Sequence, residues 1–222
     1  ICTNNDSVYE TSILLSKAGA NVKIFDIRAN LEENFKSSVQ NNNIELEYNT
    51  VPINVIGKTK VSGIQLGRKI GNIFKKTKEE DCDSLLLSGG WSPVVHLLSH
   101  RGIKPIWNNE NLCFLPDKSD EPITVIGSAS GLWNTEDCES SGINAGIKVL
   151  NEIGIKKSEY FFPKPGGWKN PIYPVFEIKT NKSRSKSFID YQHDVTADDV
   201  RLAHREGFVS VEHLKRYTTL GM

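Results

Sequence analysis

The chain has 222 residues, enough for one large domain or two small ones. Lysine plus arginine and aspartate plus glutamate each number 27, so no excess of either charge would attract nucleic acid or an anionic membrane. Hydrophobic residues make up 38%, and no apolar run approaches the ~18 residues that a membrane-spanning helix needs. The composition therefore favours a globular protein with neither nucleic acid nor a membrane as its partner.

The cysteines are scattered and form no Cys-x-x-Cys pair; they are Cys2, Cys82, Cys113 and Cys138. This spacing favours reduced thiols in the cytoplasm over a disulfide framework or a zinc site. The chain begins at Ile1, within what reads as the end of a strand, and shows no signal peptide. We therefore expect a piece of a longer cytoplasmic polypeptide.

Residues 1–26 have the pattern of a strand, a helix over 8–18 and a second strand over 21–26. Asp26 ends the second strand, where a carboxylate would hold an adenosine ribose. The turn Asn4–Ser7 contains no glycine, whereas the G-x-G-x-x-G motif lets the backbone approach a pyrophosphate. Asp26 is therefore either a weaker cofactor-binding candidate or part of a scaffold, and Arg28 is expected in a solvated loop.

Residues 31–88 are expected to form a polar helix, a three-stranded meander and a buried strand. The helix is expected over 31–40, the meander over 44–48, 50–56 and 60–66, and the buried strand over 83–88. The charged run 75–81 is predicted to be a solvated turn.

A Gly-Gly-Trp-Ser-Pro turn follows the buried strand. Gly89 and Gly90 permit backbone conformations closed to other residues, and Trp91 can either stack on a ring or serve in packing. All three are weaker cofactor-binding candidates. His96 and His100 have metal-ligand spacing on a short predicted helix, but no third ligand is near in the sequence, so no metal site is predicted.

The stretch from Pro122 to Leu150 has the pattern of a buried strand over 123–126, a turn and a helix. Such a corner accepts phosphate at the helix N-terminus, which is predicted at Asn134 or Thr135. The main cofactor-binding candidates are Gly127, Ser128, Trp133 and Thr135. Gly127 allows close approach, Ser128 is neutral, Thr135 can donate a hydroxyl hydrogen bond, and Trp133 can cover an apolar face of a cofactor. A plain strand–turn–helix unit, with Trp133 in the core, is the alternative.

The remaining residues are expected to form a connector and a helical tail. A stretch rich in proline, glycine and aromatic residues runs over 160–174, followed by a strand over 175–179 and a basic loop over 180–186. In the tail, Thr196 and Asp199 have capping-box spacing, Gly207 ends the first helix, and Ser210 begins a second.

Several of these stretches resemble the alpha subunit of heterotetrameric sarcosine oxidase. The most specific is the tail, at 194–199 and 205–219; the 88–97 turn and the 127–131 corner also look like that family. The resemblance implies an α/β fold like that of flavoproteins with two dinucleotide-binding domains. It implies an inserted second domain at 1–80, the returning half of the first domain at 81–155, a connector at 156–186, and the start of a helical domain at 187–222.

The resemblance also implies a function. The family's complex oxidatively demethylates sarcosine to glycine, giving peroxide and a one-carbon unit that passes to tetrahydrofolate in a downstream domain. Its alpha subunit binds NAD and assembles with beta, gamma and delta subunits, while FAD and FMN bind mainly through the beta subunit.

Many FAD-binding relatives have Gly-Asp at the corner that begins with Gly127. Here Gly127-Ser128 is neutral, which argues against flavin at this corner and leaves NAD open. Residues 188–222 contain no cysteine for an iron–sulfur cluster.

We expect this region to hold NAD and serve assembly without being catalytic itself. A related N-methylglutamate or opine dehydrogenase complex remains an alternative. So does a scaffold whose nucleotide site has decayed, because the Asn4–Ser7 turn lacks glycine. An independent NADH-dependent reductase would need a redox pair, and the sequence has no Cys-x-x-Cys.

Overall fold

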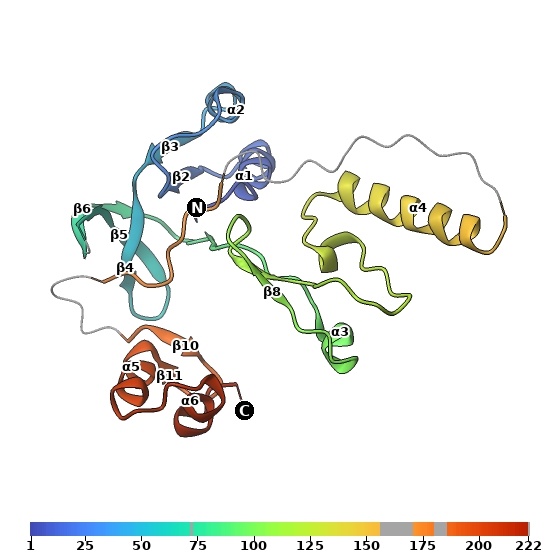
Figure 1. Ribbon diagram of the computed structural model, residues 1–222. Coiled ribbons are helices and arrows are strands. Elements are labelled where there is room, and N and C mark those ends of the chain that lie inside the picture. Colours follow the sequence, from blue (N-terminus) through green and yellow to red (C-terminus); the bar gives the residue numbers. More distant parts are fainter. Residues whose placement is uncertain (72, 156–170, 180–185, 222) are drawn as a thin grey trace.

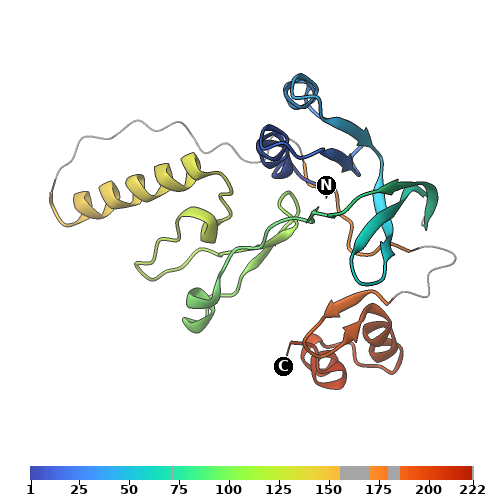
Figure 2. The same ribbon diagram turned by 180° about the vertical axis from the view of Figure 1, so that it is seen from behind.

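The computed structural model describes residues 1–71, 73–155, 171–179 and 186–221 (Figure 1). The N-terminal part holds a parallel and an antiparallel sheet, and the small helical unit at the C-terminus lies below them in Figure 1. Between them in sequence are a hairpin, which lies near the middle of Figure 1, and the long helix of residues 135–152, which lies on the right in Figure 1 and on the left in the reverse view of Figure 2.

The parallel sheet confirms the predicted strand–helix–strand unit. Its strand order is β3-β2-β1-β7, and the strands are β1 (Cys2–Thr3), β2 (Lys23–Asp26), β3 (Glu45–Tyr48) and β7 (Leu87–Ser88). Helices α1 (Val8–Lys17) and α2 (Glu33–Asn41) connect the first three strands. Ile24 and Val39 are completely buried in the core that these helices form with the sheet. Apolar residues at helical and strand spacing therefore meet as the sequence predicts.

The antiparallel sheet has the order β4-β5-β6, with β4 (Val51–Gly57), β5 (Val61–Ile70) and β6 (Ile73–Asp81). Two expectations were wrong here. Residues 44–48 join the parallel sheet instead of a meander, because Ile44 and Leu46 pack into the core between that sheet and helices α1 and α2. The charged run 75–81 is the edge strand β6, on which Lys78 pairs with Glu47 and Glu80. Charged side chains are tolerated on an edge strand because they project into solvent while the backbone pairs.

In residues 81–155, the two strands predicted at 83–88 and 123–126 are shortened or missing. The elements are α3 (His96–His100), β8 (Ile106–Asn108), β9 (Cys113–Leu115), the 3-10 helix η1 (Gly127–Ser130) and α4 (Thr135–Glu152). The expected strand at 83–88 is reduced to β7, and Leu87 is exposed. The expected buried strand at 123–126 is absent from the described residues, and Ile123 and Ile126 are exposed. A run of β-branched residues becomes a strand only where a neighbouring strand pairs with it, and β-propensity alone does not supply that neighbour.

The connector and tail close the fold. Residues 171–179 form no strand, contrary to expectation, but they run beside the N-terminal sheets in both views (Figures 1 and 2). Three of their side chains pack against the buried residues Ile27, Val51 and Phe74; they are Tyr173, Val175 and Ile178. The expected features at 156–170 and 180–185 lie outside the described residues.

The tail forms β10 (Phe188–Asp190), β11 (Val195–Thr196), α5 (Ala197–Arg205) and α6 (Val211–Thr218). The predicted capping box is confirmed, since the Thr196 hydroxyl accepts from the Asp199 amide while the Asp199 carboxylate accepts from the Thr196 amide. Phe208 and Tyr217 stack with ring centroids 4.5 Å apart and join the two helices. Ser210 precedes α6 as predicted but makes no side-chain cap hydrogen bond, so the tail is a small helical pair held by the cap of α5 and by this ring stack.

Candidate nucleotide-binding site

The turn after β1, where a glycine-rich loop would cradle a pyrophosphate, is filled by its own side chains. Asn5 is completely buried, and its amide Nδ2 donates to the Ser88 carbonyl at 3.2 Å. The Asn5 backbone amide donates to Thr3 Oγ1 at 3.1 Å, and the Ser7 amide donates to Asn5 Oδ1 at 3.0 Å. These two backbone donors are therefore engaged within the turn instead of facing an anion.

Asp26 belongs to a buried charged network beside that turn. Its Oδ2 accepts from Tyr9 Oη at 2.7 Å and from Arg28 Nη2 at 2.8 Å, and its Oδ1 accepts from the Arg28 backbone amide at 2.8 Å. Arg28 Nη1 also donates to Asp6 Oδ1 at 2.7 Å. The expectation that Arg28 lies in a solvated loop was wrong, because its guanidinium is held between two carboxylates with only 5% of the side chain exposed.

The environment of this network fixes its protonation. Burial and the adjacent Asp26 carboxylate raise the pKa of Tyr9, which keeps its hydroxyl protonated and donating. Burial alone would lower the pKa of Arg28, but its hydrogen bonds and charge pairing with Asp26 and Asp6 outweigh that and raise it. Both Asp26 oxygens already accept hydrogen bonds, so this carboxylate is committed to the network and not displayed toward a ribose.

The corner at Gly127 is more open. Helix α4 begins at Thr135, and the predicted cap is confirmed because the Asn134 side chain accepts from the Asp137 amide at 2.7 Å. Gly127 has φ +61°, a conformation that favours glycine, and its amide donates to Ser141 Oγ at 2.9 Å. Ser128 and Thr135 are both exposed. The corner thus offers two hydroxyls and the first turn of a long helix on the surface.

The structure brings together two candidate residues that are far apart in the sequence. The rings of Trp91 and Trp133 stack with centroids 6.1 Å apart and an interplanar angle of 29°. Trp133 connects η1 to α4, and Trp91 follows Gly89 and Gly90 at the carboxyl end of the parallel sheet. Ligands of open α/β sheets bind beyond the carboxyl ends of the strands, so these candidates lie at the edge where a nucleotide is expected.

A cavity of about 210 Å³ adjoins Trp91. It lies between the β1–α1 turn, the glycine turn, the segment after β8 and the connector, and its walls include Asn4, Gly90, Trp91, Asn111, Ile172 and Phe176. The sequence did not point to Asn111 or to the connector residues as site residues, since only the folded chain places them here. The run of aromatic and proline residues in the connector was the available signal.

Asn4 connects three walls of this cavity by hydrogen bonds. Its side-chain Nδ2 donates to the Gly89 carbonyl at 3.2 Å and to the Tyr173 carbonyl at 2.9 Å, and its own carbonyl accepts from the Tyr173 amide at 3.0 Å. The glycine turn and the connector are thereby fixed to the β1–α1 turn.

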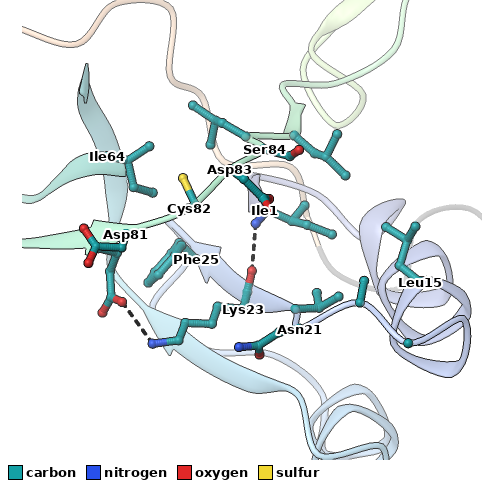
Figure 3. A pocket seen from close by; sticks show the side chains of 16 residues that line it. Ile1, Leu15, Asn21, Lys23, Phe25, Ile64, Asp81, Cys82, Asp83 and Ser84 are labelled. Carbon is teal, nitrogen blue, oxygen red and sulfur yellow. Dashed lines mark hydrogen bonds and ion pairs between the residues drawn. The ribbon is translucent and has the colours of Figure 1, made fainter. Parts of the chain in front are cut away.

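A second, larger cavity of about 690 Å³ lies at the opposite edge of the parallel sheet, and Figure 3 shows the side chains that line it. Ile1 and Lys23, at the amino ends of β1 and β2, lie on its wall, and Lys23 Nζ pairs with Glu80 Oε2 at 2.9 Å. Cys82 also lines it, and burial raises the pKa of that thiol. This cavity lies at the amino ends of the strands, whereas open parallel sheets bind ligands beyond the carboxyl ends, so it is not the candidate site.

Two further expectations concern metals and membranes. His96 and His100 are both exposed on α3, and within the described ranges no group of three or more histidine, cysteine, aspartate or glutamate residues is placed to hold a metal ion. None of the helices in the described part of the chain is long and apolar enough to cross a membrane.

The fold is that of the flavoproteins that bind FAD or NAD(P), as predicted. The chain is similar to the crystal structure of L-proline dehydrogenase from P. horikoshii, with a TM-score of 0.56 and 18% identity, over 90% of this chain and 40% of that one. At this identity the likeness establishes the fold alone.

The sequence comparisons are more specific. Residues 184–222 match the family model described as the sarcosine oxidase A3 domain. The chain is 30% identical, over its whole length, to sarcosine oxidase subunit alpha of Rhizobium meliloti (strain 1021), of which it spans 22%. It is 26% identical, over 99% of its length, to that subunit of Corynebacterium sp. (strain P-1), of which it spans 24%. The predicted resemblance to sarcosine oxidase alpha subunits is thus confirmed along the chain, which spans about a quarter of these relatives.

Proposed function

We propose that this chain is the NAD-holding and assembly region of the alpha subunit of a sarcosine oxidase complex. The observation that carries this is the similarity to alpha subunits over the whole chain, joined to a fold built for dinucleotides. In this proposal residues 1–80 are the inserted domain, 81–155 the returning half of the first nucleotide domain, 156–186 the connector, and 187–222 the start of a helical domain.

The complex as a whole oxidises the N-methyl group of sarcosine, producing glycine, peroxide and a one-carbon unit taken up by tetrahydrofolate in a downstream domain. FAD and FMN bind mainly through the beta subunit, and the gamma and delta subunits complete a cytoplasmic heterotetramer. In this proposal the region supplies no catalytic group: the Arg28 guanidinium is paired with the Asp6 and Asp26 carboxylates, and burial raises the pKa of the Cys2, Cys82 and Cys113 thiols.

The NAD contacts are assigned to the corner and the glycine turn. Gly127 and Ser128 approach the pyrophosphate, and the neutral Ser128 does not repel it as a carboxylate would. Thr135 contributes its hydroxyl beside the N-terminus of α4. Gly89, Gly90 and Trp91 form the facing wall with Trp133, as the ring stack supports.

The closed β1–α1 turn favours a second, compatible assignment for the inserted domain. Because Asn5 fills the turn and Arg28 occupies the Asp26 carboxylate, residues 1–80 act as a scaffold without a nucleotide of their own. Asp26 is then a structural residue and not a ribose ligand.

The test is to purify the complete complex, release its nucleotides by denaturation, and identify them by chromatography and mass spectrometry. One NAD per alpha subunit, together with sarcosine-dependent peroxide formation, is expected. Turnover of N-methylglutamate or an opine in place of sarcosine would select the related dehydrogenase complexes instead. A complex that releases flavins but no NAD would contradict the cofactor assignment.

A further inference from the structure

Trp91 and Trp133 form an aromatic wall with uncovered surface. Each ring covers one face of the other, yet Trp91 remains 51% exposed. Phe176, which lines the same cavity, is 79% exposed. Large aromatic surfaces left open at a cavity are characteristic of sites that receive a planar ligand.

The size of the cavity restricts what can enter it. Its volume of about 210 Å³ is below the ~300–1,000 Å³ of pockets that enclose a whole small-molecule ligand. It therefore suits one ring system of a larger molecule whose remainder lies outside. Gly89 and Gly90 also line this cavity, and no atom lies within 4 Å of where a Cβ on either residue would be.

An unused hydrogen-bond donor lies beside the stack. The indole Nε1 of Trp133 is buried and has no acceptor among the described residues. A buried donor left unpaired carries a desolvation cost.

We propose that Trp91, Trp133 and the adjoining cavity bind one planar heteroaromatic ring of the nucleotide, by stacking on the indole wall. This ring site presupposes the NAD binding proposed above and identifies where one end of that cofactor lies. The connector contributes Phe176 to the site, so the cavity is complete only when residues 171–179 are docked against the β1–α1 turn.

The experiment uses the complete complex after removal of its bound nucleotide and measures NADH binding by energy transfer from tryptophan to the reduced nicotinamide. In Trp91→Ala and Trp133→Ala, we expect NADH affinity to fall by about tenfold or more, the loss of one aromatic stacking partner. Trp91→Phe keeps a planar ring and should restore most of the affinity. Trp107→Phe is the matched control, because Trp107 packs on Phe114 in the β8–β9 hairpin.

The outcomes separate the ring site from the NAD function. NADH binding by the unaltered complex, with equal affinity in both alanine variants, would overturn the ring site and leave the NAD function standing. No NADH binding by the unaltered, stripped complex would overturn the NAD function, and the ring site with it. A loss in Trp91→Phe as large as in Trp91→Ala would also overturn stacking as the mode of binding.

Discussion

Removing the Arg28 side chain charge should destabilise the N-terminal sheet severely. In Arg28→Met, two carboxylates lose their shared cation in a site where the side chains are only 5% (Arg28), 6% (Asp6) and 0% (Asp26) exposed. Breaking a buried ion pair by removing one partner costs about 3–5 kcal/mol, because the Asp6 and Asp26 carboxylates stay buried after their cation is lost. Methionine conserves most of the aliphatic stem, so the loss reports the charge and its hydrogen bonds more than packing.

The measurement is amide hydrogen exchange followed by mass spectrometry on peptides that cover β2. If the opening that exposes β2 becomes easier by about 3–5 kcal/mol, its exchange should accelerate by roughly two to more than three orders of magnitude. Arg101→Met is the matched control, because the Arg101–Glu121 pair is exposed, and an exposed pair contributes about 1 kcal/mol or less. Equal effects of the two substitutions on their own peptides would refute the reasoning.

Three further results are expected. Ser128→Asp in the complete complex should weaken the free energy of NAD binding by on the order of a few kcal/mol, so that less NAD is retained on purification. A folded, assembled variant with full NAD content would contradict the pyrophosphate assignment. Asp190 accepts from the Gly221 amide and from His193, which lowers its pKa to about 2. The lowered pKa implies stability that is present above about pH 4 and lost as the pH falls toward 2, so helical circular dichroism of the complex should show an acid dependence that Asp190→Asn reduces. Thr219 ends α6 with φ +61°, and Thr219→Gly should stabilise the tail by about 0.5–1 kcal/mol, measured as slower exchange in α6; an unchanged or faster rate would argue against strain there.

Local signals in the sequence predicted much of the fold. The βαβ unit, the cap at Asn134 and the capping box at Thr196 all follow from residues within a few positions of one another. Such features depend on backbone propensity and on hydrogen bonds across a single turn, so the sequence contains nearly all that decides them.

The features that were mispredicted depend on distant partners. Residues 75–81 pair with β5 in spite of their charges, and residues 123–126 remain unpaired in spite of their β-branched side chains. Arg28 is buried because Asp6, brought alongside by the sheet, faces it. The Trp91–Trp133 stack likewise requires the 81–155 region to fold back on itself, which no short pattern predicts.

The hydrogen bonds between the connector and the N-terminal sheets determine where this chain can be cut for separate study. A piece ending at residue 155 would keep both N-terminal sheets but would remove the carbonyl of Tyr173 that accepts from Asn4 and the carbonyl of Lys179 that accepts from the Phe74 amide. It would also uncover the apolar side chains against which Val175 packs. A piece that keeps these contacts therefore extends through Lys179, and shorter pieces, which expose this apolar surface, should be prone to aggregate.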